Sequence, residues 1–216
     1  DVIEAYEKYN YQEVYKLTNY FVSFDLSNFY LDFTKDILYI EKEDALSRRS
    51  VQTVLYNVVN HLIRLLAPIL PYTSEEVYGY MKNSGESVHL EHMPSVAKFE
   101  GEEKIKKDFA LFFQIKEDVN KALEDARNEK LIGSSLEAEV FIDAKDEYKK
   151  VLDDLRPYLK QLFIVSEVKF ADEALPVVGK VGVQVVKSTG EKCERCWNYV
   201  GHTEDGLCPR CKNILK

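Results

Sequence analysis

The chain has 216 residues, of which 45% are hydrophobic and 31% are charged, and its formal net charge is −8. This composition is that of a globular protein, and no apolar run approaches the ~20 residues that a membrane-spanning helix requires. The acidic excess argues against binding of duplex DNA, because contacts to phosphates require lysine and arginine. The chain begins at Asp1 without a charged-then-apolar leader, so we expect a piece of a longer protein.

Helices with short connectors dominate the first 85 residues. Asp25 is expected to cap the second helix, and Thr73 or Ser74 the fourth. Pro68 ends the third helix, because proline removes a backbone donor. The four helices are predicted over residues 1–23, 26–40, 48–67 and 75–82. The third has the strongest apolar face: Val51, Leu55, Val58, Val59, Leu62, Ile63 and Leu66. We expect an up-and-down helix bundle.

A loop and a long helix follow. The loop over residues 87–101 contains His89, Glu91 and His92. These three offer metal-ligand atoms, but no other residue around them has ligand spacing, so we interpret them as loop residues. The helix is predicted over about 102–130, and Gly133 is expected to end it, because glycine tolerates the left-handed conformation.

The hydrophobic period changes near residue 133. Residues 137–143 alternate as a strand, 147–159 return to a helical pattern, and 163–170 and 181–187 again indicate strands. These elements predict a small α/β unit. We therefore expect three domains, listed here by range: a helical domain with the long helix (1–133), the α/β unit (134–189) and a C-terminal module (190–216).

All four cysteines lie in that module, as two Cys-x2-Cys pairs: Cys193, Cys196, Cys208 and Cys211. Two such turns bring four thiolates to the corners of a tetrahedron, which suits Zn²⁺. The alternatives are two disulfides or four unrelated thiols; disulfides suit secreted chains, and no secretory segment is present. A four-thiolate site leaves no open position for water, so we expect one structural zinc, in a cytoplasmic protein.

The segment between the two cysteine pairs is predicted to form a small hairpin. It carries aromatic and branched residues, followed by a turn signal at Asp205-Gly206. The module is therefore interpreted as a zinc ribbon, which has too few apolar residues to fold without its metal.

Motifs for catalysis are absent from the sequence. It contains no Gly-x-Gly-x-x-Gly, no Walker-type phosphate loop and no nucleophile elbow. Glu75 and Glu76 are adjacent on a helix and point about 100° apart, so they do not converge as a carboxylate pair. Nothing in the sequence indicates an active site.

Four stretches together resemble the C-terminal part of bacterial-type isoleucyl-tRNA synthetases. They are Asp25 to Tyr39, the Pro-x-x-Pro…Glu-Glu signature from Leu66 to Glu76, the pair Leu123–Arg127 and Ile132–Ala138, and Gly190-Glu-Lys-Cys-Glu-Arg-Cys-Trp197. The resemblance implies a mainly α fold: a class I synthetase anticodon-binding helix bundle, a small α/β junction unit and a C-terminal zinc ribbon. Tyr78 departs from the signature, which often carries Trp there.

The resemblance also implies function. In this family the helix bundle, the junction unit and the zinc ribbon bind the anticodon stem-loop of tRNA(Ile). ATP binds in an upstream catalytic domain, which ligates isoleucine to the tRNA. The adenylate-forming signatures of that domain, His-Ile-Gly-His and Lys-Met-Ser-Lys-Ser, do not occur in this sequence. The chain by itself is therefore expected to be inactive, and we expect a monomer without membrane association.

Anticodon bases are read by aromatic stacking and polar contacts. Trp197, next to a metal ligand, is the stacking candidate, although it could instead cover the metal cluster. The candidates for phosphate contacts are Arg195, Arg210 and Lys212 in the ribbon and Arg48, Arg49 and Arg64 on the bundle. Two other functions remain open: a zinc-ribbon adaptor that binds a protein, and a DNA-binding zinc module, which the acidic balance disfavours.

Overall fold

The computed structural model describes residues 1–82, 84–96, 98–177 and 179–215. The chain divides into two compact units, Asp1–Lys98 and Phe99–Lys216. The sequence pattern instead places a boundary near residue 133, because the hydrophobic period changes there. The compact units divide earlier because the long helix α6 (Glu102–Asn128) packs against elements that follow it in the chain. None of the described helices is both long and apolar enough to span a membrane.

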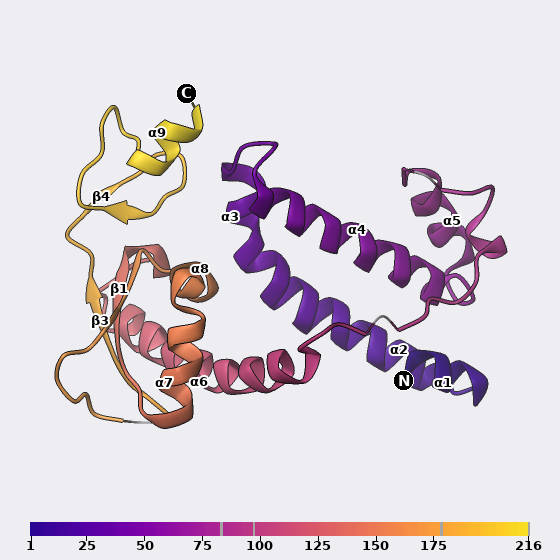
Figure 1. The fold of residues 1–216 in the computed structure, drawn as a ribbon, viewed down its shortest axis with the longest axis horizontal. Helices are drawn as coiled ribbons and strands as arrows, with labels where there is room; N and C mark the ends of the chain where they lie inside the picture. Colours follow the sequence, from indigo (N-terminus) through magenta and orange to yellow (C-terminus); the bar gives the residue numbers. More distant parts are fainter. Residues whose placement is uncertain (83, 97, 178, 216) are drawn as a thin grey trace. The chain divides into compact units, whose positions relative to one another are not determined.

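The first unit is helical (Figure 1). In chain order its α-helices are α1 (Val2–Glu7), α2 (Tyr11–Tyr20), α3 (Asp32–Ile40), α4 (Leu46–Leu66) and α5 (Pro71–Gly79). Tyr9 has φ +54° and separates α1 from α2, and the Asn10 side chain caps α2 by accepting a hydrogen bond from the Glu13 N–H at 3.2 Å. The region predicted as a single first helix is therefore two helices.

The predicted helix start at Asp25 is wrong. A π-helical segment, Phe21–Leu31, joins α2 to α3 without a break, so that one continuous rod runs beside α4 in Figure 1. Hydrogen bonds between residues i and i+5 keep the backbone paired through the segment. Asp25 consequently lies inside a helix and caps nothing.

The contact between α4 and α5 forms a small hydrophobic core. It consists of the buried residues Ile63, Ala67, Tyr78 and Val88, with Val77 and Met81 packed against it. Val88 belongs to a 3₁₀ turn, Val88–Leu90. The expected cap at Thr73 or Ser74 is wrong, because Pro71 is already the first helical residue.

The second unit packs helices against a three-stranded sheet. Besides α6, its elements are β1 (Ala138–Asp143), α7 (Asp146–Asp154), α8 (Leu159–Phe163), β2 (Glu167–Phe170) and β3 (Gly182–Lys187). The strand order is β2-β1-β3, with β1 parallel to β2 and antiparallel to β3. The α6 residue Phe112 is fully buried and stacks on Phe163, with ring centroids 5.3 Å apart. The predicted α/β unit is thus present, with α6 as part of it.

Several element ends in the second unit differ from the prediction. Helix α6 ends at Asn128, and Lys130, with φ +60°, takes the left-handed position that was expected of Gly133. The predicted helix over 147–159 ends early: α7 stops at Asp154, and a 3₁₀ turn, Arg156–Tyr158, follows it. Helix α8 then extends to Phe163, so β2 begins at Glu167 and not at the predicted residue 163. Pro157 lies in that turn and has no N–H to continue α7.

The C-terminal module contains β4 (Glu191–Lys192), β5 (Tyr199–Val200) and α9 (Pro209–Leu215). The strands β4 and β5 pair antiparallel, so the hairpin closes around the first cysteine pair. The sequence had predicted it between the two pairs. The turn at Asp205-Gly206 is confirmed, since both residues have positive φ and the Glu204 and Leu207 backbones exchange two hydrogen bonds of 3.0 Å.

Two serines connect this module to the α/β unit. The buried Ser166 donates its hydroxyl to the Leu136 carbonyl at 2.5 Å and accepts the Tyr199 N–H at 2.6 Å. The Ser188 hydroxyl accepts the Gly190 N–H at 3.3 Å. A Cβ on Gly190 would lie 2.3 Å from the Val200 carbonyl oxygen, so only glycine fits without movement.

Candidate metal centre and nucleic-acid interface

The four cysteines converge on one point. Their sulfur atoms all lie within 4.8 Å of one another, and all four residues are buried and free of disulfides. The Cys196 and Cys208 sulfurs are 3.8 Å apart. An ion bonded tetrahedrally to four sulfurs at about 2.3 Å separates them by roughly 3.8 Å. The cluster is therefore arranged to hold a metal ion.

Backbone amides support negative charge on the cluster. The Cys208 N–H donates to the Cys193 sulfur at 3.3 Å, and the Cys211 N–H donates to the Cys208 sulfur at 3.4 Å. Burial raises the pKa of the Cys196 and Cys211 thiols. Burial also opposes ionisation of Cys193, but backbone hydrogen bonds from Cys196, Cys208 and Arg195 outweigh it and lower its pKa to about 6.

Each cysteine pair sits in a tight turn. In the first, the Trp197 N–H donates to the Cys193 carbonyl at 2.9 Å. In the second, the Lys212 N–H donates to the Cys208 carbonyl at 3.0 Å, which starts α9 and places Cys211 in the helix. The short x2 spacing turns both sulfurs of a pair inward. The sequence prediction of these ligand positions follows from that local geometry.

Trp197 lies on the surface beside the cluster. Its side chain is 60% exposed, which does not fit a lid over the metal ligands. The Lys192 ammonium lies 5.4 Å from the centroid of its ring, within the range of a cation–π interaction. Lys192 was not among the candidate site residues inferred from the sequence. Its position directly before the metal ligand Cys193 is the feature that could have indicated it.

The three basic candidates of the ribbon have different surroundings. Arg195 is half-buried, and its hydrogen bond to Cys211 opposes the increase in the pKa of that thiol. The Lys212 ammonium is paired with the Glu204 carboxylate at 2.5 Å. Arg210 is half-buried at the start of α9. Arg195 thus adds positive charge beside the thiolates, whatever else it contacts.

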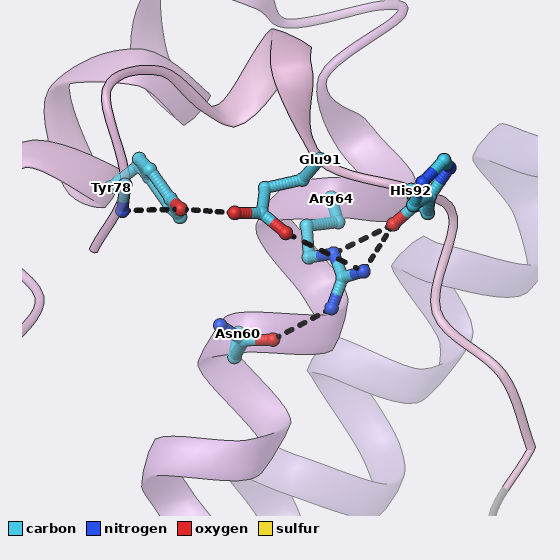
Figure 2. A network of polar contacts seen from close by, with 6 residues as sticks. Asn60, Arg64, Tyr78, Glu91 and His92 are labelled. Atoms are coloured by element: carbon cyan, nitrogen blue, oxygen red, sulfur yellow. Dashed lines mark hydrogen bonds and ion pairs between the residues drawn. The ribbon is translucent and has the colours of Figure 1, made fainter. Parts of the chain in front are cut away.

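The three arginines of the bundle also differ. Arg48 donates to the Glu41 carbonyl at 3.0 Å and is half-buried, whereas Arg49 is exposed. Arg64 is drawn into a polar network, shown in Figure 2. Its guanidinium donates to the His92 carbonyl and, at 3.2 Å, to the Asn60 side chain.

The same network reaches Tyr78. The Glu91 carboxylate lies 3.8 Å from the Arg64 guanidinium and accepts the Tyr78 hydroxyl at 2.6 Å, which raises the pKa of Tyr78. The Tyr78 hydroxyl in turn accepts the Gly85 N–H at 2.8 Å (Figure 2). The tyrosine therefore anchors the loop after α5 through its hydroxyl as well as its ring. Among the described residues, only the cysteines group as possible metal ligands. His89 lies in the 3₁₀ turn Val88–Leu90, and His92 lies in the loop that follows it.

The chain thus combines a helical unit with an α/β unit that carries a four-cysteine ribbon. Residues 1–142 match the anticodon-binding domain of tRNA ligase, and the chain belongs to that family.

The relatives are more specific. The chain is 45% identical over 226 residues to the isoleucine–tRNA ligase of Staphylococcus carnosus, covering 99% of this chain and 24% of that protein. It is 44% identical over 229 residues to the isoleucine–tRNA ligase of Geobacillus kaustophilus, covering 99% of this chain and 25% of that protein. It is also 44% identical over 228 residues to the isoleucine–tRNA ligase of Bacillus mycoides, covering 100% of this chain and 25% of that protein. The chain thus spans about a quarter of the length of the curated relatives it matches.

Proposed function

We propose that this chain is the tRNA-binding C-terminal part of an isoleucine–tRNA ligase and that it recognises the anticodon stem-loop of tRNA(Ile). The observation that carries the proposal is similarity to such ligases over 99–100% of the chain, with the four-cysteine ribbon included. The family match over residues 1–142 supports an RNA partner for the helical part.

The metal in this proposal is one Zn²⁺ per chain. Thiolates are soft ligands that favour zinc among the divalent ions of the cytoplasm, and the sulfur spacing fits a tetrahedral ion. Four sulfurs fill the coordination shell, so the ion has a structural role: it fixes the two cysteine turns and the side chains next to them.

Recognition in this proposal combines stacking with phosphate contacts. The exposed ring of Trp197 stacks on an unpaired anticodon-loop base, and the adjacent metal ligand restricts its movement. The other proposed tRNA contacts are Arg48, Arg49, Arg64, Arg195, Arg210 and Lys212. Among these, exposed Arg49 is the best supported, whereas Arg64 and Lys212 already make contacts within the protein.

The parent enzyme in this proposal is a monomeric cytoplasmic ligase. It uses ATP, bound in a separate catalytic domain, to join isoleucine to tRNA(Ile). The chain described here contributes binding and no chemistry. Isoleucine-dependent pyrophosphate exchange by the purified chain should therefore stay at background, and exchange near the rate of a working synthetase would contradict this.

The decisive experiment compares tRNA transcripts. Binding of the metal-loaded 216-residue chain is measured by gel shift against tRNA(Ile), a non-cognate tRNA, and tRNA(Ile) carrying the non-cognate anticodon. We expect the first to bind most tightly and the anticodon exchange to abolish the preference. Equal binding of all three would refute anticodon recognition. No binding of any would favour a protein-binding adaptor.

A further inference from the structure

An open groove lies between α4 and the C-terminal end of α5. Its volume is about 550 Å³, and its lining residues are Leu55, Tyr56, Val59, Tyr80, Met81 and Lys82. This volume is within the range of small-molecule sites, roughly 300–1,000 Å³. Leu55 and Val59, which the sequence pattern assigned to the core, instead border this groove, and Val59 is 36% exposed.

Two tyrosine rings flank the groove. Tyr80 is 85% exposed and Tyr56 is 42% exposed, so both have ring surface available. The Tyr56 hydroxyl donates to the Lys82 carbonyl at 2.8 Å, which fixes the ring across the junction of the two helices. A flat ligand inserted here would meet the fixed ring of Tyr56 at little loss of side-chain entropy, and the exposed ring of Tyr80 could close on it.

The positive charge of α4 favours a ligand that carries phosphate. In a chain of net charge −8, the 21 residues of α4 include Arg48, Arg49 and Arg64 but no aspartate or glutamate. Arg49 is exposed and lies seven residues before Tyr56, on the same face and about 10 Å away along the axis. The groove lining itself contains Lys82 and, among the described residues, no acid.

A second groove, between α6 and β3, shows the contrast. Its volume is about 310 Å³, and its lining includes Asp118, Asp125 and Glu129 against a single Lys121. That excess of negative charge repels a phosphate backbone. The two grooves therefore differ in the sign of charge around them, and only the one beside α4 suits a nucleotide.

We propose that the α4–α5 groove binds an unstacked nucleobase of the tRNA, with Tyr80 and Tyr56 as the stacking surface and Arg49 contacting a neighbouring phosphate. This inference rests on the proposed function, and it adds a base-binding site in the first compact unit to the one proposed at Trp197. Stacking accepts any base, because every base has a π-face, so the groove contributes affinity more than sequence preference.

The test measures tRNA(Ile) affinity of the full chain with Tyr80→Ala and with Tyr72→Ala as the matched control. Tyr80 directly follows the last residue of α5, whereas Tyr72 lies near the start of that helix, is 89% exposed and does not line the groove. We expect Tyr80→Ala to weaken binding by about 5- to 150-fold. Tyr80→Phe, which keeps the ring, should retain most of the affinity, and Tyr72→Ala should match the wild type. Both alanine variants should keep the far-UV spectrum, because the side chains are exposed.

A direct readout uses 2-aminopurine placed at successive unpaired positions of tRNA(Ile). At one position, the wild-type chain should quench the fluorescence and Tyr80→Ala should not. If Tyr80→Ala binds as tightly as Tyr72→Ala while Trp197→Ala is weakened, the groove inference is wrong and the proposed function stands. If the wild-type chain binds no tRNA, the proposed function fails and the groove inference fails with it.

Discussion

Trp197 occupies a backbone conformation that glycine adopts more easily. Its φ is +63°, in the left-handed region where a Cβ is strained. Such strain costs about 1–3 kcal/mol and is tolerated where the surrounding structure or the function requires it. The side chain is mostly exposed, so packing does not explain why a tryptophan stands there. The stacking role proposed for Trp197 would account for it.

Substitutions at this position separate structure from binding. Trp197→Gly should keep the metal and unfold no more easily than the wild type, because glycine relieves the strain. Its affinity for tRNA(Ile) should fall by about 5- to 150-fold, and Trp197→Phe should keep much of the affinity. Metal content by elemental analysis and Kd by gel shift check this. Loss of metal from Trp197→Gly would make the residue a structural lid.

Substitutions of Arg64 and Arg49 should affect different properties, namely stability for Arg64 and tRNA binding for Arg49. Arg64 holds the loop at His92 and Glu91 to α4, and its side chain is only 19% exposed. Arg64→Gln should therefore lower the free energy of unfolding by about 1.5–3 kcal/mol, measured by urea unfolding followed by circular dichroism.

The exposed Arg49 is the matched control on the same helix. Arg49→Gln should change stability by no more than about 0.5 kcal/mol. It should weaken tRNA binding and reduce the slope of log K against log salt by about 1. If Arg64→Gln lowered the free energy of unfolding no more than Arg49→Gln, the network around Arg64 would contribute little to stability.

At the scale of elements, the sequence patterns predicted correctly those features that depend on residues close together in the chain. The cysteine spacing gave the metal site, because each x2 turn brings its two sulfurs together without help from the rest of the chain. The apolar periods gave α4, α6 and β1 for the same reason. The start at Asp25 was wrong, because a capping residue has no effect where π-type hydrogen bonds keep the helix continuous.

Contacts between distant residues could not be predicted. Arg64 meets a carbonyl 28 residues away, and Ser166 meets an amide 33 residues away. Neither pairing has a sequence motif. The groove beside Tyr80 could not be predicted either. The apolar period of α4 does not show that α5 ends at Gly79 and leaves part of the apolar face of α4 uncovered.

Ser166 should control how firmly the ribbon is held. Ser166→Ala removes the buried hydroxyl that bonds both the Tyr199 N–H and the Leu136 carbonyl, and it should cost about 1–3 kcal/mol. Hydrogen exchange of the Tyr199 amide should accelerate. Ser134→Ala, at an exposed position whose side chain caps no helix, is the control. Unchanged protection at Tyr199 would mean that the β4–β5 pairing alone holds the ribbon.

At the scale of the whole molecule, metal removal should affect one part only. The ribbon depends on its cysteines, whereas Asp1–Lys98 is a separate compact unit with its own core. A strong chelator should release one zinc per chain and expose four titratable thiols, while most of the helical circular dichroism remains. A single cooperative loss of the far-UV signal on chelation would contradict this independence.

The joint at Gly190 has a consequence for motion. Because the Ser166 and Ser188 hydroxyls accept hydrogen bonds from backbone N–H groups of the ribbon, the ribbon and the α/β unit should tumble as one body on the nanosecond timescale. A ribbon on a free tether would lose orientational freedom each time an RNA bound. Here that freedom is already lost when the chain folds, so RNA binding through the contacts proposed at Trp197 would not incur this cost again.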